Sequence, residues 1–244
     1  MSFSIVVPIK NQFKIVRMCL DSIVKYYMDK DVVLVDDGSD EQTTINLLKD
    51  YSVKYSWRLF RNDCSVGHSG ACTIGIENSK YENVFLLNSD VIVTSRALTI
   101  LSDVLDGYSD IGCAGPYTCS ASGEQMIKEL YDKRYVMSED EIEKVAGDLE
   151  RSIELKDIPL VNGFCLVLRK SLFKKLDGFC VELDSYGNEK EFQIRVRKAG
   201  FRTVLVNSYV HHFGKVSYSK ENLNISQCQR DADRLILKMH GRLE

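Results

Sequence analysis

The sequence lacks a long apolar run, an excess of basic charge and any closely paired cysteines. No stretch of its 244 residues approaches the roughly 18–20 apolar residues of a membrane-spanning helix. Lysine and arginine number 32 against 35 aspartates and glutamates, so we expect no binding to a nucleic-acid backbone. The eight cysteines form no Cys-x-x-Cys motif, and several lie in apolar runs. Because a buried free cysteine behaves as a small hydrophobic residue, they favour a reducing, cytoplasmic compartment.

Glycine is missing from the end of the first predicted strand. Ser4–Ile9 continues into Lys10 and Asn11 with no Gly-x-Gly-x-x-Gly, which argues against a dinucleotide-dependent oxidoreductase. A sugar-phosphate nucleotidyltransferase usually carries a Gly-rich basic loop at this place, so this class is disfavoured too. No basic residues precede the apolar stretch at the amino terminus, so we expect a strand there and not a signal peptide.

Short β-branched runs alternate with helical patterns through the first ninety residues. Ser4–Ile9, Val32–Asp36 and Val84–Leu87 are typical of buried parallel strands. Between the first two, apolar residues recur at steps of three and four and predict one helix stripe: Ile15, Met18, Cys19, Ile23 and Val24. This order predicts an α/β fold with a mainly parallel, Rossmann-like central sheet flanked by helices.

The middle of the chain differs from both ends and predicts a helical insert over residues 117–158. Residues 124–157 hold eleven acidic and six basic side chains, a local charge of −5. Ser138 followed by Glu141 is a capping-box signal for the start of a helix. Apolar residues then recur with helical spacing: Ile142, Val145, Leu149 and Ile153. The insert is either a lid over a binding site or an ordinary surface helix with a solvated acidic face.

The rest of the chain predicts a second group of strands and helices. The expected elements are a strand over Pro159–Leu168, a helix over Ser171–Leu176, a helix over Asn188–Gly200 with Phe192, Val196 and Ala199 inward, a strand over Thr203–Val206 and an amphipathic helix over Ser226–His240. With no internal repeat and no linker, we expect one domain over residues 1–244. Its segments are 1–116, the insert, 159–217 and a C-terminal helical segment over 218–244.

Polar residues follow two of the predicted strands. Val32–Asp36 runs into Asp37-Gly38-Ser39, and Val84–Leu87 runs into Asn88-Ser89-Asp90. Taken singly, the first cluster is turn chemistry and the second is a helix cap. In open α/β sheets, however, ligands bind beyond the carboxyl ends of the strands. Taken together, the two clusters therefore predict one ligand site.

Five stretches of the chain are informative in their order and spacing. They are SIVVPIKN, VVLVDDGSD, ENVFLLNSDV, VNGFCLVLRKSLFKKLDGF, and YGNEKEFQIRVRKAGF with VHHFGKVS after it. In this order they resemble the family-two inverting nucleotide-sugar glycosyltransferases of the GT-A fold. The resemblance covers residues 4–116 and 159–217 and leaves out the insert and the tail. It implies that residues 1–116 bind the nucleotide sugar and that residues 159–217 carry the acceptor site and the catalytic residues.

The resemblance also implies where the donor binds. Pro8 and the loop after it would line the base and ribose pocket. Asp37 would be the partner of the base, with Asp36 in support, since a carboxylate accepts hydrogen bonds from an imide or a hydroxyl. The glycine-bearing loop at residues 62–71 leads into a helix, where Gly67 would offer N–H groups to phosphate. Gly163 completes this set, because it allows close approach of the backbone.

Asn88-Ser89-Asp90 stands where the resembled family carries an Asp-x-Asp metal signature. Asp90 is the expected ligand of Mg²⁺ or Mn²⁺, since such hard cations take carboxylate and phosphate oxygens together. Asn88 replaces the first acid and leaves a neutral group near the ribose or the sugar. His212 lies five residues before Ser217, as in a late histidine motif of the family, and is expected as a further metal or pyrophosphate ligand. His211 takes this role if the register shifts by one.

The implied general base is found by its spacing from an arginine. Family members usually show Glu-Asp after Tyr-Gly, six residues before an arginine. Here Arg195 lies six residues after Glu189, so Glu189 takes the place of the aspartate and Asn188 that of the glutamate. Glu189 would remove the proton from the acceptor hydroxyl, with Glu191 as the alternative. The helix dipole alone also favours acids at the start of a helix, and this interpretation stays open.

The implied reaction is a single displacement with inversion, from a nucleoside-diphosphate sugar to a hydroxyl of a glycan or lipid-linked glycan. By analogy, the family works mostly in surface polysaccharide synthesis. A lipid-linked acceptor would bring the protein to the inner face of a membrane, although no basic amphipathic anchor is present. Because Asn88 and Asn188-Glu189 depart from the family pattern, a catalytically silent glycan-binding module remains an alternative. The enzyme hypothesis requires four side chains to converge around one pocket: Asp37, Asp90, Glu189 and His212.

Overall fold

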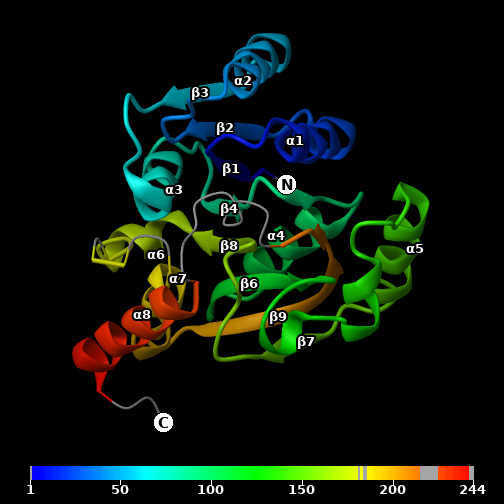
Figure 1. Cartoon of the computed structure of the whole chain (residues 1–244). Coiled ribbons are helices and arrows are strands. Elements are labelled where there is room, and N and C mark those ends of the chain that lie inside the picture. Colours follow the sequence, from blue (N-terminus) through cyan, green and yellow to red (C-terminus); the bar gives the residue numbers. More distant parts are fainter. Residues whose placement is uncertain (1, 181, 184–185, 215–224, 242–244) are drawn as a thin grey trace.

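The computed structural model describes residues 2–180, 182–183, 186–214 and 225–241. Its centre is an eight-stranded sheet with the order β3-β2-β1-β4-β8-β6-β9-β7, which runs from top to bottom in Figure 1. The strands are β1 (Ser4–Ile9), β2 (Asp31–Asp36), β3 (Arg58–Arg61), β4 (Asn83–Leu87), β6 (Ile111–Tyr117), β7 (Leu155–Asp157), β8 (Cys165–Arg169) and β9 (Arg202–Tyr209). A separate two-stranded ribbon pairs β5 (Val91–Ile92) with β10 (His211–His212).

The amino-terminal half is the parallel part of the sheet. β1 pairs in parallel with both β2 and β4, and β2 pairs in parallel with β3. In the other half β6 and β9 are parallel, whereas β8 runs antiparallel between β4 and β6, and β7 runs antiparallel at the edge. The α/β fold with a mainly parallel sheet, predicted from the sequence, is confirmed. Its β-branched runs are buried on both faces, as parallel strands between helix layers require.

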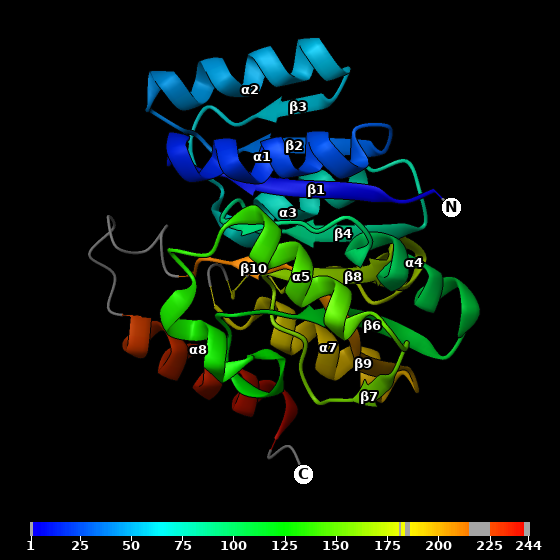
Figure 2. The same cartoon turned by 90° about the vertical axis from the view of Figure 1, so that its right-hand side faces the viewer.

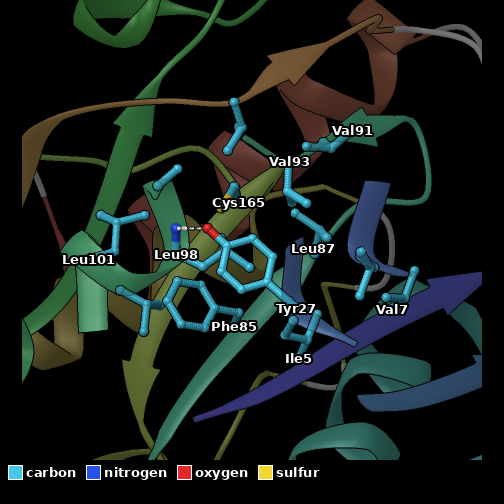
Figure 3. Close-up of a cluster of buried hydrophobic side chains, with 14 of the residues drawn as sticks. Ile5, Val7, Tyr27, Phe85, Leu87, Val91, Val93, Leu98, Leu101 and Cys165 are labelled. Atoms are coloured by element: carbon cyan, nitrogen blue, oxygen red, sulfur yellow. Dashed lines mark hydrogen bonds between the residues drawn. The ribbon is translucent and has the colours of Figure 1, made fainter. Parts of the chain in front are cut away.

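The sheet is covered by helices on both faces. They are α1 (Phe13–Tyr27), α2 (Gln42–Tyr55), α3 (Gly67–Glu77), α4 (Ala97–Gly107), α5 (Glu139–Leu149), α6 (Lys170–Lys175), α7 (Asn188–Lys198) and α8 (Ile225–His240). Because strand side chains alternate between faces, Ile5 and Val7 of β1 pack into a core with α1, α2 and α4, whereas Val6 packs into a core with α3, α6 and α7. In the first core the Tyr27 hydroxyl accepts a hydrogen bond from the Leu98 N–H at 3.1 Å (Figure 3).

Three of the predicted apolar stripes contain a wrong residue. Met18, Ile153 and Ala199, which the spacing places inward, are exposed. In α1 the buried stripe runs instead through Val16, Cys19, Leu20, Ser22, Ile23 and Tyr27. Ile153 and Ala199 lie beyond the last residues of α5 and α7. Apolar spacing thus located the helices but not their ends or the phase of their buried faces.

The strand expected over Pro159–Leu168 begins only at Cys165, so residues 159–164 form a loop. Gln193 of α7 holds this loop through two hydrogen bonds. The Val161 N–H donates to Gln193 Oε1 at 2.8 Å, and Gln193 Nε2 donates to the Val161 carbonyl at 2.8 Å. The loop is therefore fixed against α7, and it places Gly163 and Phe164 at the carboxyl end of β4, whose next residue, Asn88, donates its N–H to the Phe164 carbonyl.

The expected insert is attached to the body of the molecule. It contains the short 3-10 helices η1 (Gly123–Gln125) and η2 (Lys128–Lys133), then α5 with the predicted Ser138 capping box, and β7, which pairs with β9. Glu139 of α5 forms an ion pair with Lys25 at 2.8 Å, and Glu143 accepts hydrogen bonds from Ser95. Figure 2 shows α5 lying along the side of the sheet. These attachments favour a packed surface helix over a lid.

The predicted C-terminal helix is α8, which covers Ile225–His240. The other residues of the expected segment 218–244, apart from Gly241, lie outside the described part of the chain, as do the last three residues of the VHHFGKVS motif. Ala232 and Ile236 of α8 pack against Leu183 and Ile194. Among the described residues, no helix combines the length and the apolar character needed to cross a bilayer.

Candidate active site

The first polar cluster begins with Asp36, whose carboxylate is satisfied within the chain. Asp36 is buried and forms an ion pair with Arg61, and its Oδ1 accepts a hydrogen bond from the Ser39 N–H at 2.9 Å. Pro8 lies beside Val35 in the β1–β2 register and is buried as well. The contacts of Asp36 therefore close the turn that follows β2.

Asp37 accepts four hydrogen bonds from the loop that leads into α3. Its Oδ1 accepts from Asn62 Nδ2 at 2.9 Å and from the Val66 N–H at 2.8 Å. Its Oδ2 accepts from Ser65 Oγ at 2.6 Å and from the Gly67 N–H at 3.1 Å. A carboxylate offers about four lone-pair positions, so its own chain already occupies the acceptor capacity of Asp37. The carboxylate thereby caps the start of α3.

This geometry bears on two expected donor-binding residues. The N–H of Gly67 is directed to Asp37, so in this arrangement it is not open to a phosphate. Gly38 makes the close packing possible, because it has a φ of +70° and a Cβ there would lie 2.8 Å from the Ser65 nitrogen. Asp37 and Gly67, both expected to contact the donor, are instead hydrogen-bonded to each other in this structure.

The second polar cluster brings Asp90 and His212 face to face. Asp90 precedes β5, and His212 is paired with Val91 of β5 across the small ribbon. The distance from Asp90 Oδ1 to His212 Nε2 is 3.2 Å, and both side chains are largely buried. The Phe213 N–H also donates to the Asp90 carbonyl at 3.1 Å. Two residues more than a hundred positions apart are thus joined as the sequence predicted.

His212 is held in one orientation by its surroundings. Its Nδ1 lies 2.6 Å from the Ser120 carbonyl, which can only accept, so Nδ1 carries a proton. Phe164 stacks on the imidazole with ring centroids 5.0 Å apart and planes 15° from parallel. With Nδ1 committed to Ser120, Nε2 is the nitrogen that faces the Asp90 carboxylate.

His211 faces the other way, because successive strand residues point to opposite faces. It is fully buried, its Nε2 lies 2.7 Å from the Arg134 carbonyl, and its Nδ1 lies 3.1 Å from the Tyr209 hydroxyl. Burial lowers the pKa of His211 below its ordinary value. The structure therefore places His212, and not His211, beside Asp90.

Glu189 lies at the start of α7 with its carboxylate over Gly163. A Cβ at Gly163 would lie 2.6 Å from Oε1 of Glu189, so any larger residue there would require the Glu189 carboxylate to shift. Among the described residues, the Glu189 carboxylate makes no hydrogen bond or ion pair. Burial, and then the charges of Glu189 and Asp37, raise the pKa of the Cys72 thiol in α3. Glu189 and Asp37 are thus both close to the first turns of α3.

Glu191, the alternative base, is part of an ion-pair cluster. Its carboxylate is 1% exposed and accepts hydrogen bonds from Arg195 Nε at 2.8 Å and Nη2 at 2.6 Å. His240 Nε2 of α8 lies 2.9 Å from its Oε1. Burial alone would raise the pKa of Glu191, but the hydrogen bonds from Arg195 and His240 outweigh it and hold the pKa below its ordinary value. The structure does not place this side chain with the others.

Two consecutive residues connect these parts into one site. Gly163 lies under Glu189, and Phe164 stacks on His212, so the Glu189 and Asp90–His212 groups are neighbours. Asn88 also belongs here through its backbone contact with Phe164.

Sequence reasoning did not include Phe164 or Ser120. Phe164 had a signal, its place next to Gly163 in a motif, whereas nothing in the sequence singled out a backbone carbonyl at Ser120.

The sheet order, with polar clusters at the ends of β2 and β4, defines a fold of GT-A type. Residues 4–177 match the model of glycosyl transferase family 2, and the chain belongs to this family, as its motifs indicated. Glycosyltransferase GlyA of Streptococcus pneumoniae is 23% identical over 227 residues, which are 85% of this chain and 32% of GlyA. The chain thus spans about a third of the length of that relative.

Two solved structures share the fold over most or all of the chain. Staphylococcus aureus TarS 1–349 in complex with UDP-GlcNAc has a TM-score of 0.69 at 17% identity, with 100% of this chain and 68% of that chain covered. The mannosyltransferase PcManGT from Pyrobaculum calidifontis, in complex with GDP-Man and Mn²⁺, has a TM-score of 0.67 at 16% identity, with 88% and 58% covered. At these identities the likeness concerns the fold alone.

Proposed function

We propose that this chain is the catalytic domain of an inverting glycosyltransferase that moves a sugar from a nucleoside-diphosphate sugar to a hydroxyl group. One observation carries the proposal: the Glu189 carboxylate, which has no partner among the described residues, lies over Gly163, and the next residue, Phe164, stacks on the His212 that faces Asp90. A candidate general base and a candidate metal-binding pair thus lie near each other at the carboxyl end of the sheet, where open α/β sheets bind ligands. The solved relatives in complex with UDP-GlcNAc and GDP-Man support a nucleotide-sugar donor.

Asp90 and His212 fit a divalent cation that is shared with the donor. A carboxylate oxygen and an imidazole nitrogen lie 3.2 Å apart. The Ser120 carbonyl holds a proton on the far nitrogen, as is common for metal-bound histidine, so that Nε2 would be the nitrogen to bind a cation. The described residues contain no group of three acidic, His or Cys side chains that could hold a metal. Mg²⁺ and Mn²⁺ are compatible with so few protein ligands, because they take phosphate oxygens and water alongside one or two carboxylates. Such an ion would neutralise charge on the departing diphosphate.

Glu189 supplies the proton transfer in this mechanism. Its carboxylate accepts the proton of the acceptor hydroxyl while the hydroxyl oxygen attacks the anomeric carbon. The bond between that carbon and the diphosphate oxygen breaks, its electron pair leaves with the diphosphate, and the configuration inverts. Because no partner holds the carboxylate among the described residues, it is available to the acceptor. Glu191, held by Arg195 and His240, is not the residue we propose for this step.

Asp37 and Asp36 serve the donor site by shaping it. Asp37 holds the loop of residues 62–67 against β2 through four hydrogen bonds, and Asp36 holds the preceding turn through Arg61. We therefore place the base and ribose of the donor against this loop, near Pro8 and Asn88. Direct contact of Asp37 with the nucleotide base of the donor remains a prediction. It requires Asp37 to give up one of these four hydrogen bonds in order to accept one from the donor.

The acceptor is proposed to be a glycan or a lipid-linked glycan, in surface polysaccharide synthesis. The support is the family and its relatives and not a feature of the described residues. Contact with a membrane surface, a cytoplasmic location, the single-domain organisation and the oligomeric state remain predictions to be tested on the protein.

The test is release of UDP or GDP from UDP-GlcNAc, other UDP-sugars and GDP-mannose with Mn²⁺. We expect Glu189→Gln to lower turnover by about 10²–10⁴-fold while donor binding, measured by thermal shift, is kept. Glu77→Gln, an exposed glutamate at the far end of α3, is the matched control. Full turnover in Glu189→Gln would move the base elsewhere. Binding of glycans without any release would favour the glycan-binding module instead.

A further inference from the structure

Asn188 makes two hydrogen bonds that join the two halves of the site. Its Nδ2 donates to Ser69 Oγ of α3 at 2.7 Å, and its Oδ1 accepts from the Glu189 N–H at 2.8 Å. Asn188 and Ser69 are 2% and 6% exposed. Ser69 belongs to the first turn of α3, the helix whose start Asp37 caps. A buried side-chain link therefore connects the donor half of the sheet with the helix that presents Glu189.

The direction of each hydrogen bond in this link is determined by chemistry. The Ser69 hydroxyl lies 2.7 Å from the Leu183 carbonyl, which can only accept, so the single hydroxyl proton points there. Ser69 Oγ must then accept from residue 188. The Glu189 N–H, in contrast, needs an acceptor on residue 188. Only a side chain that donates at one end and accepts at the other satisfies both, and an amide does so.

This requirement accounts for asparagine where the resembled family carries glutamate. An ionised carboxylate at position 188 would have no proton to donate to Ser69 Oγ. The serine would then turn its own proton to the carboxylate and leave the Leu183 carbonyl without it. A second negative charge would also stand beside Glu189. The neutral amide avoids both consequences.

We propose that the Ser69–Asn188 hydrogen bond is a positioning bridge, which sets the start of α7 against the start of α3 and so holds the Glu189 carboxylate over Gly163. This inference rests on the proposed role of Glu189 as base. Neither Ser69 nor Asn188 takes part in the chemistry. They act through Glu189, because positions displaced by about 1 Å can cost up to a hundredfold in rate.

The experiment compares Ser69→Ala, Asn188→Ala and the double variant in the sugar-nucleotide release assay. Ser79→Ala is the matched control, because Ser79 is also 6% exposed in the region of α3 and its hydroxyl also donates to a backbone carbonyl, that of Ile76, at 2.6 Å. Ser69→Thr keeps the hydroxyl and serves as rescue. Ser69→Cys keeps the approximate size of the side chain but hydrogen-bonds only weakly, and it replaces Ser69→Ala if that variant does not fold. Glu189→Gln is measured alongside.

If the bridge positions the base, Ser69→Ala and Asn188→Ala each lower kcat by roughly ten- to hundredfold with donor KM nearly unchanged. The double variant then loses less than the product of the two single losses, since both changes break the same Ser69–Asn188 hydrogen bond. Ser69→Thr recovers most of the turnover, and Ser79→Ala keeps it. Ser69→Cys lowers kcat in the same direction as Ser69→Ala does.

Three results would overturn the bridge. Turnover of Ser69→Ala equal to that of Ser79→Ala would show that the hydrogen bond positions nothing. Losses that multiply in the double variant would show that the two residues act independently. A raised donor KM with unchanged kcat would place the effect on binding. Each of these, with Glu189→Gln inactive, leaves the proposed function intact, whereas an active Glu189→Gln removes the base itself.

Discussion

The two polar clusters at the carboxyl ends of the sheet differ in what satisfies their charges. After β2, Arg61 pairs with Asp36, and four donors of the chain surround Asp37. In the second cluster, Asp90 has only His212 beside it among the described residues, and Glu189 has no partner there. A carboxylate that is removed from water with few partners costs free energy, and Asp90 is buried while Glu189 is half-buried. We therefore interpret the first cluster as the framework of the site and the second as its chemistry.

The largest effect that tests this comparison is expected from Asp90→Asn. The substitution keeps the shape of the side chain but removes the charge that would hold a divalent cation. We expect Mn²⁺-dependent release of nucleoside diphosphate to fall by at least about a hundredfold, a magnitude typical for loss of electrostatic stabilisation. The melting temperature should change little, because an asparagine keeps a hydrogen-bonding oxygen beside His212, the side-chain partner of Asp90 in the described structure. Wild-type turnover in this variant would remove Asp90 from the chemistry.

The corresponding substitution in the first cluster, Asp37→Asn, should lower the stability of the fold. An asparagine would keep acceptors for two of the four donors but turn an amide toward the Gly67 N–H. Loss of hydrogen bonds to a charged group costs about 2–3 kcal/mol, which for a chain of this size is a fall of roughly 5–10 °C in melting temperature. Thermal unfolding measures it directly. A melting temperature equal to that of the wild type would show that Asp37 is not part of the framework, and would favour direct contact with the donor.

The smallest effect is expected from replacing Glu150. This carboxylate lies outside the site and serves as a control for the comparison of the two clusters. It follows α5, is 5% exposed, and its Oε1 has no hydrogen-bond partner in the described structure. Burial raises its pKa to about 7. If every carboxylate that lacks hydrogen-bond partners took part in catalysis, replacing Glu150 would lower turnover. We expect it to matter only for stability, because it lies in the insert against β9.

Linkage determines the sign of the Glu150 effect. Above pH 7 the group is ionised in both states and the folded state bears the cost of burial; below about pH 4.5 it is protonated in both and the cost is absent. Glu150→Gln should thus stabilise the protein by about 1–2 kcal/mol at pH 8 and by nothing near pH 4. Urea unfolding at the two pH values measures this difference. Equal effects at both would contradict the raised pKa, and a large loss of turnover would break the comparison.

Strands and motif positions were predictable because they depend on local patterns. Val32–Asp36 and Val84–Leu87 are recognisable from β-branched runs, and the Ser138 capping box from a spacing of three residues. Helix faces were less predictable. Met18 has the right spacing but the wrong phase, because the packing of α1 on the sheet decides which stripe is buried. The loop over 159–164 was missed because its hydrogen bonds go to Gln193, in a helix still to come in the chain.

By itself, the sequence determined the fold class, the family and the set of polar residues at the ends of β2, β4 and α7. These follow from burial patterns and residue spacings within short stretches, which can be recognised in each segment without knowledge of the others. Only the tertiary structure shows that His212, and not His211, lies beside Asp90, and that Glu191, and not Glu189, is held in an ion-pair cluster among the described residues. The pairing of β10 with β5 turns His212 to Asp90, and His240 of α8 joins Arg195 in occupying Glu191. The Glu191–Arg195 pair is local, because the two residues are four positions apart on one helix. The contacts of His212 with Asp90 and of His240 with Glu191 join segments far apart in the chain, so no local pattern could reveal them.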